Sequence, residues 1–364
     1  MKKLLTLILA VMTIVGVNSA ERRSFNSGEV WLDTNSEMIN AHGGGLLFHK
    51  GRYYWIGEHK GEKAQAREGI RMYSSKDLYT WRNEGIVMSV APEGSGSDIE
   101  SGCIIERPKV VYNKKTKKFV IWFHLELKGK GYAAARYGVA QSDNITGPYE
   151  FLYSSRSSKG EWPINMSKEE QAYALTKTDL VRNTPEGRAD LIKGGYVARD
   201  IEGGQMSRDQ TIFIDDDGTA YHIFASEENA TLHIAELTDD YLYHIGKWQR
   251  VLPGRSNEAP AVMKREGKYW MISSGCTGWA PNKARLAVAD SMMGEWRELP
   301  NPCRGEGADT TFGGQSTYIL KVEGKRDEWI FMADIWRPND LADSRYIWLP
   351  IQFDGDGTPY IEWE

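Results

Sequence analysis

The chain repeats one pattern five times, and each repeat consists of short strand-like segments instead of helices. A repeat begins with two apolar or alternating runs around a polar turn, as in GGGLLFHKGRYYWIGE from Gly43 and TIFIDDDGTAYHIFAS from Thr211. Such runs, rich in aromatic and β-branched residues, are typical of β-hairpins. A related second pair follows each of the first four, and YIWLPIQFDGDGTPYIEW follows the fifth. Two hairpins per repeat, at a spacing of roughly fifty residues, predict an all-β, five-bladed β-propeller.

The repeats also set the expected boundaries of the blades. We place the five blades at about residues 40–100, 104–155, 207–253, 256–300 and 309–364. An irregular stretch of about residues 154–206 separates blades two and three, and Ser167 and Glu170 within it have the spacing of a helix capping box. We therefore expect a partly helical insertion there. A strand from residues 25–35 is one candidate for closing blade five.

The first twenty residues have the order of a secretory signal peptide. Two lysines precede an apolar run of about fourteen residues, and small residues end at Ala20. A run of this length is short for a membrane span, so we expect cleavage near Ala20. Residues 21–364 would then form a single propeller domain, exported to the periplasm or outside the cell, with no membrane attachment.

Charge and cysteine content narrow the possible partners. A net charge of -5 and a pI near 5.9 give no basic surface for nucleic acid or an anionic membrane. A neutral or small partner and a monomeric state are expected. Cys103, Cys276 and Cys303 lack the spacing of metal ligands, so we expect no metal and no cofactor. Cys276, at the end of a hairpin, is expected to be buried.

A propeller brings one segment of every blade to its axis, so functional residues should recur at the start of each inner strand. These starts read Ala41-His42-Gly43, Glu106-Arg107-Pro108, Ser207-Arg208-Asp209, Asn257-Glu258-Ala259-Pro260 and Gly313-Gly314-Gln315-Ser316. Three carboxylates and one carboxamide therefore occupy equivalent positions.

Converging carboxylates predict acid–base chemistry. They raise one another's pKa, so one can stay protonated near neutral pH while another is ionised. Glycoside hydrolysis needs this division, because an acid protonates the leaving oxygen while a basic group activates water. Trp279 and Trp336, near the ends of inner hairpins, are suited to stacking on a sugar ring, and His42 is placed near the axis.

The segments IERPKVVYN, MSRDQTIFIDDDGTAYHIFASEENATLHIAELTDDYL, NEAPAVMKREGKYWMISSGCTGWAPN, GGQSTYIL and RYIWLP resemble glycoside hydrolase family 43. Within it they resemble the exo-β-1,3-galactanases and their close relatives. The resemblance spans nearly the whole mature chain. It implies a five-bladed propeller and hydrolysis with inversion at the anomeric carbon.

The resemblance also implies roles for individual residues. It makes Glu258 the general acid, with Asp209 orienting that acid and tuning its pKa. The usual family aspartate at the start of blade one is missing, and the resemblance implies that Gln315 acts on the water through an imidic acid form. Glu106 is the alternative base, although the branch uses it mainly to bind sugar hydroxyls. The other sugar contacts that it implies are Glu58, Tyr132, Asn229 and Thr277.

The expected function is an exported, inverting exo-glycosidase that releases galactose from β-1,3-linked galactan or arabinogalactan. An α-L-arabinofuranosidase or a β-D-galactofuranosidase is the alternative within the family. A sugar-binding propeller that has lost catalysis is the alternative outside it. All three predict an oligosaccharide or polysaccharide partner.

Overall fold

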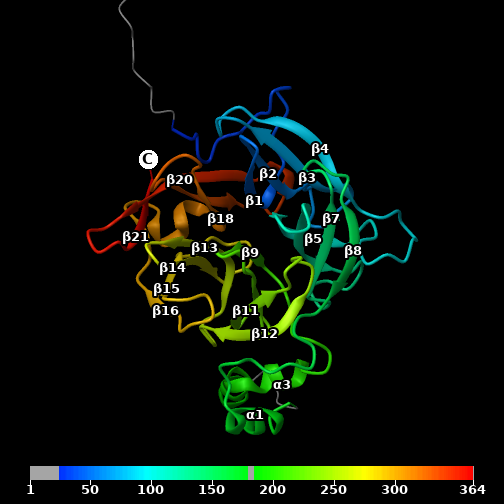
Figure 1. The fold of residues 1–364 in the computed structure, drawn as a ribbon, viewed down its shortest axis with the longest axis vertical. Coiled ribbons are helices and arrows are strands. Elements are labelled where there is room, and N and C mark those ends of the chain that lie inside the picture. The colour runs from blue at the N-terminus through cyan, green and yellow to red at the C-terminus, as the bar shows by residue number, and fades with distance from the viewer. Residues whose placement is uncertain (1–23, 179–183, 364) are drawn as a thin grey trace, which may run out of the picture.

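A computed structural model describes residues 24–178 and 184–363 of the chain. The expected signal peptide lies outside the described residues. Five sheets surround a common axis (Figure 1), so the predicted five-bladed propeller is confirmed. No helix within these two ranges is long and apolar enough to cross a membrane.

Each blade consists of two successive hairpins, as the repeats predict. The strands of blades one and two are β1 (His42–His49), β2 (Arg52–Glu58), β3 (Gly69–Ser75), β4 (Arg82–Ser89), β5 (Ile104–Asn113), β6 (Lys118–Glu126), β7 (Arg136–Ser142) and β8 (Glu150–Ser155). Those of blades three and four are β9 (Gln210–Ile214), β10 (Ala220–Ser226), β11 (Thr231–Leu237), β12 (His244–Val251), β13 (Asn257–Arg265), β14 (Lys268–Gly275), β15 (Arg285–Ala289) and β16 (Arg297–Leu299). Blade five contains β17 (Cys303–Arg304), β18 (Gln315–Lys321), β19 (Trp329–Ile335), β20 (Arg345–Phe353) and β21 (Pro359–Glu362).

The innermost strands of the blades form the ring around the axis. They are β1, β5, β9, β13 and β18, and each contacts the next, with β18 returning to β1. Middle strands such as β6, with the sequence KFVIWFHLE, are buried on both faces because each blade lies between two others. This explains why their sequences are nearly continuous apolar runs and do not alternate.

Blade five is closed by a strand other than the candidate considered above. β17 pairs in parallel with β21 through Cys303 and Ile361, which makes this sheet five-stranded. The segment at residues 25–35 forms no strand of blade five. It packs beside the blade instead, where the Gly28 amide donates to the Tyr346 carbonyl and Ser27 Oγ donates to the Trp348 carbonyl.

The predicted helical insertion between blades two and three is present. It contains α1 (Lys168–Leu175), α2 (Pro185–Asp190), the π-helical turn η1 (Leu191–Gly195) and α3 (Tyr196–Asp200). The predicted capping box is also confirmed: Ser167 Oγ accepts from the Glu170 amide, and a Glu170 carboxylate oxygen accepts from the Ser167 amide at 2.7 Å. The helices lie beside blade three (Figure 1).

Two cysteines belong to the core, whereas the third does not. Cys103 and Cys303 are buried in apolar clusters between blades. Cys276 is exposed, so the expectation that it is buried is wrong. The reason is local, because β14 ends at Gly275 and Cys276 is the first residue of the following loop.

Candidate active site

All five blades contribute a side chain to one pocket at the axis. Its volume is about 250 Å³. Glu58 comes from blade one, Glu106 from blade two, Asp209 from blade three, Glu258 from blade four and Gln315 from blade five. The positions that the repeats align in sequence therefore meet in space.

A bulge at the start of the inner strand occurs in four of the five blades. The strand register shifts just after His42, Glu106, Glu258 and Ser316. In three blades the next residue has a left-handed backbone: Gly43, Arg107 and Ala259 have φ of 58°, 54° and 52°. Such bulges bend a strand and redirect its side chains, which is how Glu106 and Glu258 come to face the pocket.

Glu258 is the carboxyl group of the pocket that can hold a proton near neutral pH. Burial raises its pKa to about 7, and the negative charge of Asp209 adds to this effect. Asn229 Nδ2 donates to Glu258 Oε1 at 2.7 Å and fixes the orientation of the carboxyl group. Arg208 extends this support, because it donates to Asn229 Oδ1 and to the Tyr132 carbonyl.

Arg107 is the buried cation at the centre of the site. Its Nη2 lies 2.9 Å from Asp209 Oδ2 and donates to Gln315 Oε1 at 2.6 Å. Its Nη1 donates to the Ser316 carbonyl at 3.1 Å. Burial alone would lower the pKa of Arg107, but neighbouring carboxylates, Asp209 foremost, raise it. Asp209 is thus held in an ion pair beside the acid.

The carboxamide of Gln315 is fixed on both sides. Its Oε1 accepts from Arg107 Nη2 and from Trp336 Nε1, the latter at 2.9 Å, while its Nε2 donates to Ser274 Oγ at 3.0 Å. Arginine and tryptophan side chains can only donate, so the atom that faces them must be the amide oxygen. Only the nitrogen side of the amide remains available to a water molecule.

The pKa of Glu106 is shifted in the opposite direction to that of Glu258. Burial would raise its pKa, but His124, Lys60 and Tyr132 lower it to about 2. Tyr132 donates to Glu106 Oε1 at 2.8 Å, and His124 Nδ1 lies 3.1 Å from Oε2. Burial alone would lower the pKa of His124, but Glu106 and Glu126 outweigh this effect and raise it to about 9. Glu106 is therefore a strongly held anion that accepts hydrogen bonds.

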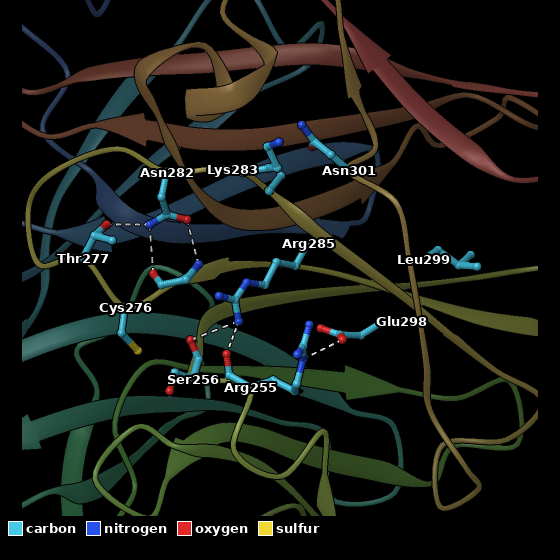
Figure 2. A pocket seen from close by; sticks show the side chains of 12 residues that line it. Arg255, Ser256, Cys276, Thr277, Asn282, Lys283, Arg285, Glu298, Leu299 and Asn301 are labelled. Carbon is cyan, nitrogen blue, oxygen red and sulfur yellow. Dashed lines mark hydrogen bonds and ion pairs between the residues drawn. The ribbon is translucent and has the colours of Figure 1, made fainter. Parts of the chain in front are cut away.

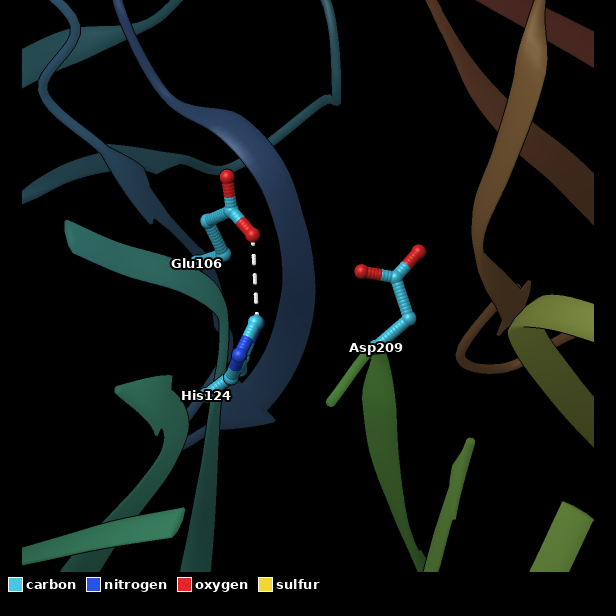
Figure 3. Close-up of side chains that lie close together, drawn as sticks. All are labelled: Glu106, His124 and Asp209. Atoms are coloured by element: carbon cyan, nitrogen blue, oxygen red, sulfur yellow. Dashed lines mark ion pairs between the residues drawn. The ribbon is translucent and has the colours of Figure 1, made fainter. Parts of the chain in front are cut away.

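Glu106, His124 and Asp209 also form a group whose ligand atoms lie within 4.8 Å of one another, close enough for a metal ion (Figure 3). The figure shows Glu106 paired with His124 while Asp209 faces them from blade three. A protonated imidazole has no lone pair for a metal, and Arg107 already neutralises Asp209. The charges of this group are thus balanced by side chains.

Glu58 and Lys60 form a buried ion pair on the blade-one side of the pocket. The Arg107 amide donates to Glu58 Oε1 at 2.8 Å, and burial raises the Glu58 pKa despite the charge of Lys60. Gly43 is required here, because a Cβ at this position would lie 2.2 Å from Glu58 Oε1.

Two tryptophans form an aromatic wall of the pocket. The ring centres of Trp279 and Trp336 are 5.5 Å apart, and the two rings meet edge to face with 69° between their planes. The Arg107 guanidinium lies 5.6 Å from the centre of the Trp336 ring. Trp279 is 40% exposed and is free to contact a ligand.

Two predicted sugar contacts do not line this pocket. Thr277 lies on the neighbouring loop, where its Oγ1 donates to the Ala280 carbonyl at 2.6 Å and it lines a separate groove. His42 is fully buried behind the pocket and stacks on Tyr346 with 5.0 Å between ring centres. The bulge after His42 carries Gly43, and not His42, toward Glu58 and Arg107.

Sequence reasoning missed several residues of the site. Arg107, His124 and Arg208 line the pocket, and Lys60 pairs with Glu58 beside it. A signal for His124 was available, since it interrupts the apolar run of β6 and pairs in register with Glu106. Arg107 and Arg208 each adjoin a predicted site residue, but a surface arginine would look the same in sequence.

Comparison with known proteins agrees with this arrangement. The sequence profile of glycosyl hydrolases family 43 matches residues 188–360. The β-1,3-galactosidase BT3683 of that family, solved with galactodeoxynojirimycin, is 58% identical with a TM-score of 0.88, over 93% of this chain and 98% of its own. The exo-β-1,3-galactanase 1,3Gal43A of Clostridium thermocellum is 33% identical with a TM-score of 0.75, over 93% of this chain and 64% of its own.

A curated relative matches over a shorter length. The β-D-galactofuranosidase xynD of Aspergillus niger is 30% identical over 119 residues, which are 32% of this chain and 34% of the relative. The chain thus matches about a third of the length of this relative. The similarity to BT3683 extends over almost all of both chains, and the chain therefore belongs to glycoside hydrolase family 43.

Proposed function

We propose that the protein is an inverting exo-glycosidase that releases terminal galactose from β-1,3-linked galactan or arabinogalactan. The observation that carries the proposal is that Glu258, whose pKa is raised to about 7, shares a pocket of about 250 Å³ with Asp209, which forms an ion pair with Arg107. A pocket of this size suits one sugar ring, which favours removal of single terminal residues. The similarity to a protein described as a β-1,3-galactosidase and to one described as an exo-β-1,3-galactanase supports galactose as that residue.

In the proposed reaction Glu258 donates its proton to the leaving glycosidic oxygen. Asn229 holds the carboxyl group, and burial together with the charge of Asp209 keeps it protonated up to about neutral pH. Asp209 itself is fixed by Arg107. An acid whose pKa lies near the working pH transfers its proton efficiently.

Gln315 is proposed to position the attacking water through its Nε2 side. In the imidic acid form, C(OH)=NH, this nitrogen accepts the proton that the water loses on attack, and the resulting protonated amide later releases one proton to solvent. Arg107 and Trp336 both donate to the amide oxygen, so an imidic hydroxyl at that oxygen requires one of these donors to move away when the sugar binds. Glu106 is the alternative candidate for the base, although a carboxylate with a pKa of about 2 has little affinity for a proton. Its place in the pocket, where Tyr132 donates to it, suits binding of sugar hydroxyls.

A furanosidase is the second candidate. The match to a β-D-galactofuranosidase over 119 residues favours it, although that match covers a third of the chain. The reaction and the acid would be the same, and the shape of the terminal sugar would differ.

One incubation series tests these candidates. The protein is mixed with β-1,3-galactan, an aryl α-L-arabinofuranoside and an aryl β-D-galactofuranoside, and the released monosaccharides are identified. We expect galactose from galactan alone. Release from an aryl furanoside alone would replace the proposal with a furanosidase, and binding without release from any substrate would indicate a non-catalytic sugar-binding propeller.

We also propose that residues 1–20 direct export, and that the mature enzyme is a monomer in the periplasm or outside the cell. The order of charged, apolar and small residues in this segment supports export. Mass spectrometry of the N-terminus of the exported protein tests the cleavage, which we expect near Ala20.

A further inference from the structure

A second cavity lies beside the catalytic pocket, on the side of Glu258. We call it the blade-four groove. Its volume is about 420 Å³, and its lining includes Arg255, Cys276, Lys283, Arg285 and Glu298 (Figure 2). None of these residues has a role in the proposed chemistry.

The groove connects with the catalytic pocket through shared residues. Asn229 lines both the catalytic pocket and a chamber of about 240 Å³ that Arg188 and Tyr196 of the insertion help to form. Ser256 and Cys276 line both this chamber and the blade-four groove. The three cavities therefore adjoin one another, with Asn229 and Cys276 at their boundaries, and we take this row of cavities as the path from the acid to the groove.

The chemistry of the reaction gives this path a direction. The general acid protonates the oxygen that the leaving saccharide carries away, so the leaving chain must extend from the pocket past Glu258. Asn229 links the acid to the groove, because its Nδ2 donates to Glu258 Oε1 at 2.7 Å and its carbonyl accepts from the Cys276 thiol at 3.6 Å. The groove thus begins where the leaving saccharide has to pass.

The groove has a positive charge that its own carboxylate does not balance. Three cations and one carboxylate, Glu298, line it, and Glu298 pairs with Arg255 at 2.6 Å. Lys283 pairs with Asp309, but both side chains are more than half exposed, so the pair is weak.

Arg285 is the cation at the centre of the groove. In Figure 2 its guanidinium lies between Cys276 and the Arg255 backbone. It donates to the Ser256 carbonyl at 3.3 Å and to other backbone and amide oxygens, all uncharged. Among the described residues no carboxylate forms an ion pair with it.

We propose that the blade-four groove binds an anionic group, a uronate or a sulfate ester, carried by the leaving part of the saccharide. This inference rests on the proposed galactosidase activity. The insertion and the loop after β14 shape the path, and Arg285 and Lys283 supply the charge. The enzyme would then favour acidic galactan chains over neutral ones.

The test compares three β-1,3-galactotrioses: a neutral one, one whose reducing-end residue is oxidised to a uronate, and one that carries a sulfate ester there. We expect kcat/KM to be roughly 3- to 10-fold higher for an anionic substrate, as a few partly exposed charges would give, and the preference to fade in about 0.5 M NaCl. The uronate and sulfate arms show which anion is preferred.

A matched pair of variants locates the effect. Lys283→Glu should remove the preference, whereas Lys268→Glu should keep it. Lys268 is the proper control because the two lysines match. Their side chains are 55% and 58% exposed, and each forms an ion pair with an exposed aspartate at 2.9 Å. Normal cleavage of the neutral substrate without any anionic preference would overturn this inference alone. No cleavage of any of the three would overturn the proposed function, and this inference with it.

Discussion

At the scale of single residues, two carboxyl groups in one pocket are driven to opposite states. Glu258 has few compensating donors and a pKa of about 7, whereas Glu106 forms an ion pair with His124, accepts a hydrogen bond from Tyr132 and has a pKa of about 2. Burial is the largest single effect on both. The difference lies in the hydrogen-bond donors, and it separates an acid from a sugar-binding anion.

Glu258→Gln removes the proposed acid while it keeps the shape of the side chain. We expect kcat to fall by about 10²- to 10⁴-fold, because general acid catalysis supplies about this much. Sugar binding, measured by calorimetry with galactose, should persist. The isosteric Glu106→Gln should instead weaken galactose binding. Turnover of Glu258→Gln within tenfold of the wild type would contradict the assignment.

The pKa of Glu258 also predicts how activity depends on pH. The acid must be protonated, so kcat should decline about tenfold per pH unit above pH 7, where the pKa lies. A pH profile from 5 to 9 on an aryl β-galactoside with a good leaving group should lack this decline, because such a leaving group needs no acid. The same decline on both substrates would assign it to another group.

The raised pKa has a cost in stability whose sign is fixed. Below about pH 4.5 the Glu258 carboxyl group is protonated in both the folded and unfolded states and does not lower the free energy of unfolding. As pH rises from about 4.5 to about 7 the unfolded state loses the proton first, so the free energy of unfolding falls. Glu258→Gln should therefore be more stable than the wild type at pH 8, by on the order of 1–3 kcal/mol, and equal to it near pH 4. Thermal unfolding at both pH values measures this, and equal melting temperatures at pH 8 would contradict it.

Gln315 makes a different prediction, because its amide is clamped by Arg107 and Trp336. Gln315→Ala should lower kcat by about 10²-fold through loss of the positioned water. Gln315→Glu should retain more activity and move the pH decline upward, since another negative charge near Glu258 raises its pKa. A glutamate variant as fast as the wild type would show that a carboxylate suffices and that no tautomer is needed.

At the scale of strands and loops, the bulges at the starts of the inner strands set the direction of the catalytic side chains. Ala259 follows Glu258 with a φ of 52° and is buried. A β-branched residue there is strongly disfavoured, whereas glycine is not. Ala259→Val should lower kcat more than tenfold by turning Glu258 away, and Ala259→Gly should keep at least half of it.

Ala261→Val separates this effect from crowding. Ala261 is also buried in β13, but its backbone is extended, so valine there adds volume without strain at a left-handed position. We expect a lower melting temperature with little change in kcat for Ala261→Val. Equal losses of kcat in Ala259→Val and Ala261→Val would show that the bulge has no special role.

The same bulges mark the limit of what the sequence could predict. The period of the repeats gave the blades and the ring of Glu106, Asp209, Glu258 and Gln315, because a strand start is visible as a change of pattern. His42 was placed near the axis from the sequence, whereas the bulge after it brings Gly43 toward the pocket instead, and no sequence pattern showed this bulge. Thr277 was misplaced for a similar reason, because loop geometry after β14 has no periodicity. Strand β17 was missed because two residues carry no pattern.

At the scale of the whole molecule, a propeller is a ring, and its blades meet at the axis and at the rim. At the axis, Arg107 joins three blades: it extends from blade two and contacts Asp209 of blade three and Gln315 of blade five. Beneath it, Lys109 Nζ donates to the Gly43 carbonyl at 2.8 Å, and Gln210 Nε2 donates to the Arg107 carbonyl at 2.6 Å. The active site is therefore also a junction that holds the ring together.

Arg107→Met tests this double role. Removing one partner of a buried ion pair leaves Asp209 uncompensated, so we expect a loss of about 3–5 kcal/mol of stability. The charge of Arg107 also lowers the pKa of Glu258, so the pH decline of kcat should move upward in the variant. Thermal unfolding and a pH profile measure the two effects.

The matched control is Arg265→Met at the rim. Arg265 of β13 pairs with Asp327 between β18 and β19, so it also joins two blades, but Asp327 is 42% exposed. An exposed pair contributes at most about 1 kcal/mol, so this variant should unfold near the wild-type temperature with an unchanged pH profile. If both variants lost equal stability and neither moved the pH decline of kcat, the double role of Arg107 in stability and catalysis would be contradicted. Arg107→Lys, which keeps the charge but not the forked geometry, should retain the position of the pH decline while losing the bond to Gln315.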